Sequence, residues 1–334
     1  MFFEFLILFL LSIIFIYYIK KHALRWGLID IPNDRSIHSD HIPRGAGIGF
    51  FLAVIIVLPL FHIDILYQYS WTFLAIFLVF IIGILDDFYN TSPNTKFIIL
   101  IVSTIFLSLD DLMIDNIGTF FGIDIQLGWI ALPFTVFAVT GFTNALNLID
   151  GLDGLAASIS IVILFAFFVV GYQNNDLFIT VVALFFITTL LAFLLFNWYP
   201  ATIFMGDSGS LTLGFVISVL AIKSLNYLPA ISILFIAALP IFDTVIVMVR
   251  RRRNGVSMFS ADRCHMHHII RHFFMEDTKK TVFFFSILQM IYSMTGLQLN
   301  KDMEEGYLII LIILNIVLLY IFLSAMIKRQ KRKC

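Results

Sequence analysis

Long apolar runs separated by short polar segments cover almost the whole chain. A bilayer crossing needs about 20 mostly apolar residues in a helix, and many of these runs approach that length. We therefore predict one all-α, polytopic integral membrane domain over residues 1–334, with about eleven transmembrane helices. The expected spans are 2–19, 46–62, 70–85, 95–109, 129–146, 155–172, 177–196, 209–223, 229–249, 281–297 and 306–327.

Composition supports a membrane location. Hydrophobic residues make up 60% of the chain and charged residues 13%, with a mean hydropathy of +1.00, whereas a soluble domain is roughly half apolar. The first run lacks a basic leader and a small-residue cleavage site, so we expect a retained helix in place of a cleaved signal peptide. Cys264 and Cys334 lie in basic segments that we place in the cytoplasm, a reducing compartment, so we expect no structural disulfide. No nucleic-acid partner is expected.

Basic residues indicate how the chain is oriented. Five Lys and Arg residues fall in 20–45, eight in 250–280 and five in the C-terminal tail, while Lys96 borders another segment of the same side. By the positive-inside rule we place the N-terminus in the periplasm and the C-terminus in the cytoplasm of a bacterial inner membrane. The cytoplasmic segments are then 20–45, 86–94, 147–154, 197–208, 250–280 and the tail.

Asp86 and Asp87 end the third expected span. Two carboxylates at the edge of the hydrocarbon are costly to ionise unless water or a cation balances them, so they are functional candidates. A solvated helix end is the alternative. Lys96 begins the next span, either as an anchor at the lipid headgroups or as a contact to a substrate phosphate.

Polar residues interrupt the apolar pattern again in the segment TNALNLIDGLDGLAAS. Asn144 and Asn147 are three residues apart, as are Asp150 and Asp153, so helical spacing would place each pair on one face. Their number favours a binding site over the alternative, a helix-loop-helix with polar caps.

Asp207 lies in the sequence MGDSGS, just before another span. A lone Asp at a helix start is ordinarily an N-cap. Here other cytoplasmic acids can converge with it, and Mg²⁺ takes a few carboxylates together with water and substrate phosphates. We therefore predict Mg²⁺, with Mn²⁺ as the second choice.

A basic cluster rich in histidine follows the ninth span. Part of it serves as a positive-inside signal, but histidines flanked by arginines also suit phosphate oxygens, to which protonated imidazole would donate charge-assisted hydrogen bonds. Zinc is disfavoured because no acid or cysteine has a suitable spacing. The candidate residues are Arg263, His265, His267 and His268. With the acids, they indicate phosphoryl-type transfer at the cytoplasmic face.

Several motifs, in order along most of the chain, resemble the polyprenyl-phosphate N-acetylhexosamine-1-phosphate transferase superfamily. It includes the undecaprenyl-phosphate N-acetylglucosamine-1-phosphate transferases of O-antigen (lipopolysaccharide) and teichoic-acid linkage synthesis, and the phospho-MurNAc-pentapeptide transferase. The matching segments are DIPNDRSIHSDHIPRGAGIG, GILDDFYNTSPNTK, NALNLIDGLDGLA, FMGDSGSL and the His-x-His-His motif. The chain departs from the family at Arg44-Gly45-Ala46-Gly47, where adjacent glycines are usual.

The resemblance implies roles for these residues. Asp86 and Asp87 would assist the attacking lipid phosphate near the metal, and Asp207 would bind Mg²⁺. The catalytic set is Asp86, Asp87, Asp207, His265, His267 and His268, with the three aspartates as metal ligands. The substrate-binding set is Arg44, Lys96, Asn144, Asn147, Asp150, Asp153, Asn197 and Arg263.

The implied reaction transfers a sugar 1-phosphate from a UDP-sugar to undecaprenyl phosphate, releases UMP and starts a cell-surface glycan. N-acetylglucosamine is the first choice of sugar and another UDP-N-acetylhexosamine the alternative. Direct attack by the lipid phosphate and a two-step route through an aspartyl intermediate both stay open. A homodimer is also implied. The rival class is a secondary transporter, against which the charges gather at one face and no inverted repeat is visible.

Overall fold

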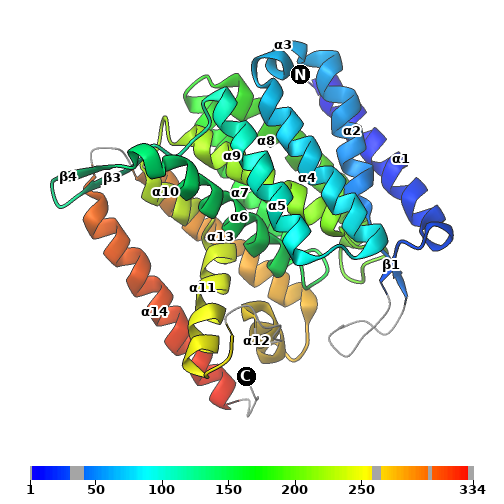
Figure 1. The fold of residues 1–334 in the computed structure, drawn as a ribbon. Helices are drawn as coiled ribbons and strands as arrows, with labels where there is room; N and C mark the ends of the chain where they lie inside the picture. Colours follow the sequence, from blue (N-terminus) through cyan, green and yellow to red (C-terminus); the bar gives the residue numbers. More distant parts are fainter. Residues whose placement is uncertain (1, 31–40, 258–264, 300–302, 330–334) are drawn as a thin grey trace.

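The computed structural model describes residues 2–30, 41–257, 265–299 and 303–329, and helices dominate it (Figure 1). Two short antiparallel pairs, β1 (Ile29–Asp30) with β2 (Ile42–Pro43) and β3 (Asn116–Phe120) with β4 (Ile123–Gln126), join them. The helices are α1 (Phe2–Trp26), α2 (Ala46–Phe61), α3 (Ile63–Gln68), α4 (Ser70–Tyr89), α5 (Pro93–Leu107), α6 (Ala131–Ile149), α7 (Leu155–Gln173), α8 (Leu177–Asn197), α9 (Asp207–Ser224), α10 (Ala230–Ile236), α11 (Ala238–Arg253), α12 (Met266–Phe273), α13 (Thr278–Gln298) and α14 (Glu305–Arg329), with single turns η1 (Ser108–Asp110) and η2 (Gly128–Ile130).

The all-α, polytopic membrane architecture predicted from the apolar runs is confirmed. Every predicted span falls on a helix or, for one of them, on the pair α10 and α11. In the described part of the chain, seven helices are long and apolar enough to cross a membrane, or eight if a bent pair counts as one span. The count of eleven crossings and the orientation of the termini stay predictions.

The expected span 229–249 is not one straight helix, because the chain bends by 86° between α10 and α11. Pro240 has no N–H to donate to the carbonyl of Ile236, so the helical ladder stops there. Gln289 of α13 replaces the missing bonds: its Nε2 donates to the Ile236 carbonyl at 2.7 Å, and its Oε1 accepts from the Leu239 N–H at 3.1 Å. A broken helix is stable at membrane depth only with such partners.

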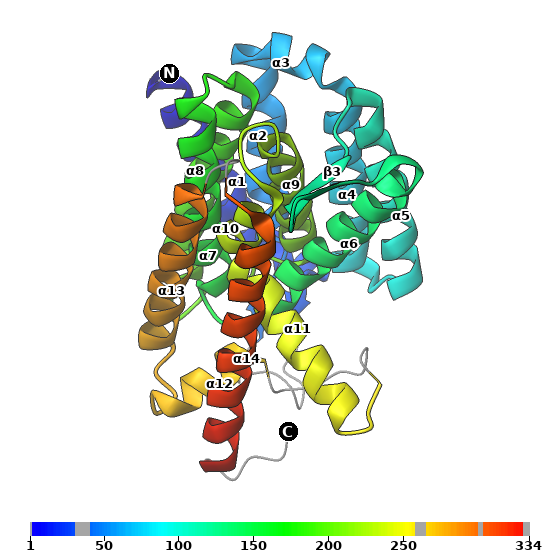
Figure 2. The same ribbon diagram turned by 90° about the vertical axis from the view of Figure 1, so that its left-hand side faces the viewer.

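Apolar side chains also cover the outside of the molecule. α14 is the clearest case: Ile310, Ile313, Leu314 and Val317 are all exposed, and the helix runs along one edge of the bundle in Figure 1. Exposed apolar rows of this kind suit lipid chains rather than water. The start of α1 and the end of α14 lie at opposite ends of the molecule in Figures 1 and 2.

The hairpin β3–β4 was not expected, since 110–128 reads as an irregular connection. It projects from the helices in Figure 1 and is tied to the start of α14, where the Gly122 N–H donates to Glu304 Oε1 at 2.8 Å. The Phe121 ring packs edge-on against Tyr307 with centroids 5.9 Å apart. The hairpin therefore braces the loosely packed last helix.

Candidate active site

The turn between α4 and α5 brings a lysine back beside an aspartate. α4 ends at Tyr89 and is capped by Asn90, whose φ of 49° is a left-handed conformation that Asn tolerates. Ser92 caps α5, and Pro93 is its first residue, a position where the missing N–H costs nothing. Because this turn is short, Lys96 in the first turn of α5 reaches Asp86 in the last turns of α4.

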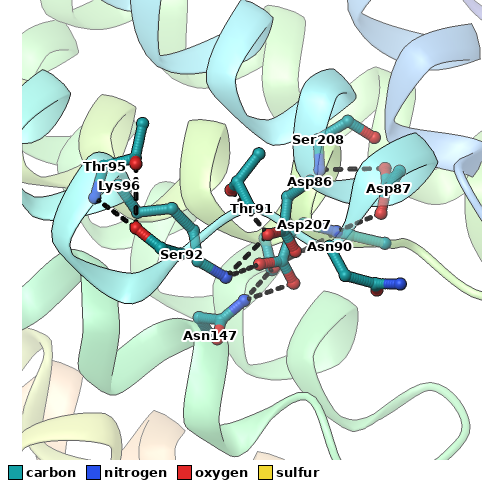
Figure 3. Close-up of polar contacts among 12 residues, drawn as sticks. Asp86, Asp87, Asn90, Thr91, Ser92, Thr95, Lys96, Asn147, Asp207 and Ser208 are labelled. Carbon is teal, nitrogen blue, oxygen red and sulfur yellow. Dashed lines mark hydrogen bonds and ion pairs between the residues drawn. The ribbon is translucent and has the colours of Figure 1, made fainter.

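Asp87 holds the beginning of α9. Its Oδ1 accepts from the Asp207 N–H at 2.8 Å and its Oδ2 from the Ser208 N–H at 3.1 Å (Figure 3). The two helices approach closely because Gly83 faces Ser208, where a Cβ would lie 2.6 Å from the Ser208 Cα. The carboxylate is 2% exposed and occupies the positive end of the helix dipole. Asp87 thus fixes the position of Asp207.

Four side chains from four helices then meet, and we call Asp86, Lys96, Asn147 and Asp207 the acidic centre. The Lys96 Nζ lies 3.1 Å from Asp86 Oδ1 and 2.8 Å from Asp207 Oδ2 (Figure 3). Asn147 Nδ2 donates to Asp207 Oδ1 at 3.0 Å and to Ser210 Oγ at 2.8 Å. The ammonium offsets the repulsion between two carboxylates in a partly buried place.

The acidic centre offers two carboxylates, of the kind that a divalent cation binds. A cationic group, the Lys96 ammonium, is already held between the carboxylates of Asp86 and Asp207. Mg²⁺ needs only one or two carboxylates when substrate phosphates and water complete its shell, and Asp87 offers less because both its oxygens bond to α9. Within the described residues no group of three or more His, Cys, Asp or Glu could hold a metal. The predicted Mg²⁺ stays a prediction.

Asp150 and Asp153 follow α6 in the loop beside the acidic centre. Burial, and to a smaller extent the charges of Asp207, Asp153 and Asp87, together raise the pKa of Asp150 to about 7. Asp153 has a structural contact, since its Oδ2 accepts from the Ala201 N–H at 2.8 Å. The loop therefore carries one carboxyl group that can change its charge near neutral pH.

Asn197 is a buried brace. Its Oδ1 accepts from the Gly154 N–H at 2.9 Å, and its Nδ2 donates to the Ile203 carbonyl at 3.0 Å. Together with Asp153 it fixes the loop that follows α8 against the loop that follows α6. Asn144 lies one turn before Asn147 and has no side-chain hydrogen bond in the described part of the chain. Direct substrate contacts by these residues stay predictions.

Arg44 lies next to the same site but faces backbone and amide groups. Its Nη2 donates to the Asp87 carbonyl at 2.7 Å and to Asn90 Oδ1 at 3.3 Å. The segment after β2 is thereby tied to the end of α4. A substrate contact by Arg44 stays a prediction.

His265, His267 and His268, which we call the histidine cluster, stand at the start of α12. The rings of His265 and His267 are stacked with centroids 5.7 Å apart. His267 is 2% exposed, and within the described residues neither of its ring nitrogens has a hydrogen-bond partner. Burial lowers its pKa well below the usual value, assisted by His268 and His265, so the ring is neutral where sequence reasoning expected a protonated donor. Arg263 lies outside the described residues.

Two further polar residues support the site, and sequence reasoning missed both. Asp243 of α11 contacts His265 Nδ1 through Oδ2 at 2.7 Å, and Thr91 Oγ1 donates to Asp86 Oδ1 at 2.8 Å. The signal for Asp243 was present, because an acid inside an expected span is a functional candidate by default. Thr91 carries no comparable signal.

The fold and the site define a multi-pass membrane protein whose polar chemistry gathers where several helices end. Residues 69–225 match glycosyl transferase family 4. The chain is 33% identical over 288 residues to the probable undecaprenyl-phosphate N-acetylglucosaminyl 1-phosphate transferase of Bacillus subtilis, covering 85% of this chain and 80% of that protein. The undecaprenyl-phosphate alpha-N-acetylglucosaminyl 1-phosphate transferases of Yersinia pestis and Escherichia coli K12 are 31% and 30% identical, over 80% and 79% of this chain and 76% and 74% of theirs. The chain belongs to this family, within the polyprenyl-phosphate N-acetylhexosamine-1-phosphate transferase superfamily that its motifs resemble.

Proposed function

We propose that the protein transfers a sugar 1-phosphate from a UDP-sugar to undecaprenyl phosphate, giving undecaprenyl-diphospho-sugar and UMP. N-acetylglucosamine 1-phosphate is the preferred group, because the relatives in Bacillus and Escherichia carry that sugar in their names. Another UDP-N-acetylhexosamine is the alternative donor. The observation that supports the reaction best is the bridge from Asp86 through Lys96 to Asp207, assembled from three helices.

In this reaction an oxygen of the lipid phosphate attacks the β-phosphorus of the donor. A new P–O–P bond forms, the bond from the β-phosphorus to the bridging oxygen breaks, and UMP leaves with that electron pair. Asp86 is the carboxylate placed to take a proton from the attacking phosphate, while Lys96 and Asn147 keep Asp207 in place. Mg²⁺ or Mn²⁺ held by Asp86 and Asp207 would offset negative charge on the diphosphate and on departing UMP.

The site is proposed to face the cytoplasm of a bacterial inner membrane, where the product would begin a cell-surface glycan. Support comes from the basic ends of two helices, Arg250 to Arg253 on α11 and Lys328 with Arg329 on α14, which match the positive-inside rule. The homodimer that the resemblance implies is testable by cross-linking in native membranes.

Release of UMP by the purified protein tests the proposal. The assay supplies undecaprenyl phosphate, Mg²⁺ and a panel of UDP-sugars to the wild type and to Asp86→Asn and Asp207→Asn. Each variant should lose roughly 100-fold or more of kcat, as expected when a charged group that stabilises a transition state is removed. Asp176→Asn is the matched control, because this aspartate caps α8 away from the acidic centre and its loss should leave the rate unchanged.

No UMP release with any donor, from a folded sample, would contradict the assignment, and uptake driven by an ion gradient would favour a transporter. Labelling of the protein by donor in the absence of lipid would favour the two-step route through Asp86 over direct attack.

A further inference from the structure

Asp243 is a buried acid outside the acidic centre, and its carboxylate makes two contacts. It lies in the second turn of α11 and is 1% exposed. Its Oδ2 is 2.7 Å from His265 Nδ1, and its Oδ1 accepts from the Met266 N–H at 2.7 Å. The same side chain thus holds an imidazole ring and the first turn of the helix that carries the histidine cluster.

These contacts determine which nitrogen His265 can offer. With Nδ1 bonded to a carboxylate, Nδ1 carries a proton and the ring presents Nε2 to its surroundings. His265 is buried, and in the described part of the chain its Nε2 has no hydrogen-bond partner. An oriented ring with one nitrogen available is suited to contact a ligand.

The bend between α10 and α11 makes this arrangement possible. Because Pro240 ends the helical ladder and Gln289 accepts from the Leu239 N–H, α11 sets out in a new direction. A straight helix through this region would carry Asp243 along the axis of α10 instead. The conformation of the broken helix and the orientation of His265 are therefore connected through one residue.

We propose that Asp243 is a positioning residue, which sets the tautomer and the direction of the His265 ring so that Nε2 faces the diphosphate of the donor. That Nε2 faces the donor diphosphate rests on the proposed function, whereas the control of the His265 tautomer by Asp243 does not. Asp243 does not touch the reacting atoms and acts through His265.

Asp243→Asn separates positioning from a purely structural role. The amide keeps an oxygen for the Met266 N–H, so the start of α12 is retained, but its NH₂ now faces His265 Nδ1. That nitrogen must then accept, which moves the proton to Nε2. In ¹⁵N-histidine NMR spectra, with His265→Gln used to identify the signal, we expect the wild type to show a protonated Nδ1 and Asp243→Asn a protonated Nε2.

Kinetics complete the test. Asp243→Asn and His265→Gln should each lower kcat/KM for the UDP-sugar by about 10- to 100-fold, the range for outer partners of a functional histidine. The double variant should lose no more than His265→Gln alone, because both changes remove one unit. The matched control is Glu4→Gln, another buried acid paired with a histidine, because Glu4 Oε2 lies 2.7 Å from His62 Nε2. This pair lies at the far end of the bundle, and distant sites act independently. The kcat/KM of Glu4→Gln should therefore stay within about twofold of the wild type.

The outcomes distinguish the two proposals. An unchanged His265 tautomer in Asp243→Asn, or additive losses in the double variant, would overturn the positioning role. A tautomer change without any loss of kcat/KM would overturn it as well. If the wild type released no UMP, the proposed function would fail, while the NMR comparison would still decide whether Asp243 sets the ring. Thermal unfolding of Asp243→Asn should match the wild type, and Asp243→Ala, which loses the acceptor for Met266, should unfold earlier.

Discussion

The acidic centre and the histidine cluster are both polar sites in an apolar protein, but they are stabilised differently. In the acidic centre, Asp86, Lys96, Asn147 and Asp207 satisfy one another across four helices. In the histidine cluster, His267 is buried with neither ring nitrogen bonded within the described residues. The side chains of the acidic centre already bond to one another, whereas the histidine cluster contains a ring whose two nitrogens have no partner among the described residues.

This difference indicates that the acidic centre and the histidine cluster have different roles. A buried polar group without a partner costs about 1–3 kcal/mol, a cost that a ligand can remove by supplying the partner. Groups that already hold one another instead keep their geometry before a substrate arrives. The acidic centre therefore suits the reacting end of the site, and the histidine cluster suits recognition of a bound group.

Removing the Lys96 ammonium from the acidic centre should have the largest effect on the rate of UMP release. Lys96→Gln leaves Asp86 and Asp207 facing each other without compensation. We expect kcat to fall by roughly 100-fold. Because the ammonium no longer competes for the two carboxylates, the Mg²⁺ concentration that gives half of the maximal rate should also fall. UMP release measured over a Mg²⁺ titration gives both quantities.

Lys223→Gln is the control for this change. Lys223 also pairs with an acid, at 3.9 Å from Asp176 Oδ2, but at the opposite end of α9 from Asp207. Its loss should leave both the rate and the Mg²⁺ dependence as in the wild type. An unchanged Mg²⁺ dependence in Lys96→Gln would mean that lysine and metal do not share a place.

The helices could be predicted from the sequence because apolar runs of sufficient length have few other solutions in a membrane. The bend between α10 and α11 was not predicted, because 229–249 is apolar enough to be taken for one span although Pro240 and Asp243 lie within it. Pro240 gives a local reason for a break, yet the partners that stabilise it, Gln289 and Ser293, come from α13 about fifty residues later. Such a break depends on tertiary contacts that a local pattern does not contain.

For the site, residue types were predictable and their pairings were not. Asp86, Asn147 and Asp207 were chosen as polar residues in apolar surroundings, and they do converge. That Lys96 bridges two carboxylates, in addition to any substrate contact, depends on distances between helices. Asp87 was grouped with Asp86 because they are adjacent, but successive helical residues point in different directions, and Asp87 faces the start of α9.

A smaller effect is expected at the junction of the two sites. Gly151 lies against the histidine cluster, and a Cβ there would be 2.5 Å from His267 Nε2. Gly151→Ala should push this ring aside and lower kcat/KM for the UDP-sugar by about tenfold, the loss of one good hydrogen bond. The thermal unfolding temperature should change little, because a side chain rather than backbone must move.

Gly141→Ala provides the comparison for Gly151→Ala. This glycine is on α6, where a Cβ would meet nothing within 4 Å, so activity should be retained. In a His267→Ala background, Gly151→Ala should cause no additional loss. A further loss in that background would show that the loop, and not the His267 ring, is what Gly151 protects.

The smallest effect is a dependence of stability on pH at Asp150, which lies between the two sites. Its pKa is raised from 3.8 to about 7 by burial and then by the carboxylates of Asp207, Asp153 and Asp87. Between pH 3.8 and about pH 7 the folded protein therefore keeps a proton on Asp150 that the unfolded chain has released. The free energy of unfolding falls as the pH rises through this range, and the loss is complete above about pH 7. Asp150→Asn cannot ionise, so in detergent its unfolding temperature should exceed that of the wild type by a few degrees at about pH 8 and by less at about pH 5.

Asp124→Asn is the control, because hydrogen bonds from Asn116 and Gln126 lower the pKa of this exposed carboxyl and its removal should give no gain at high pH. Parallel curves for Asp150→Asn and the wild type would mean that the carboxyl is already ionised, and that the loop joins the acidic centre to the histidine cluster without a proton.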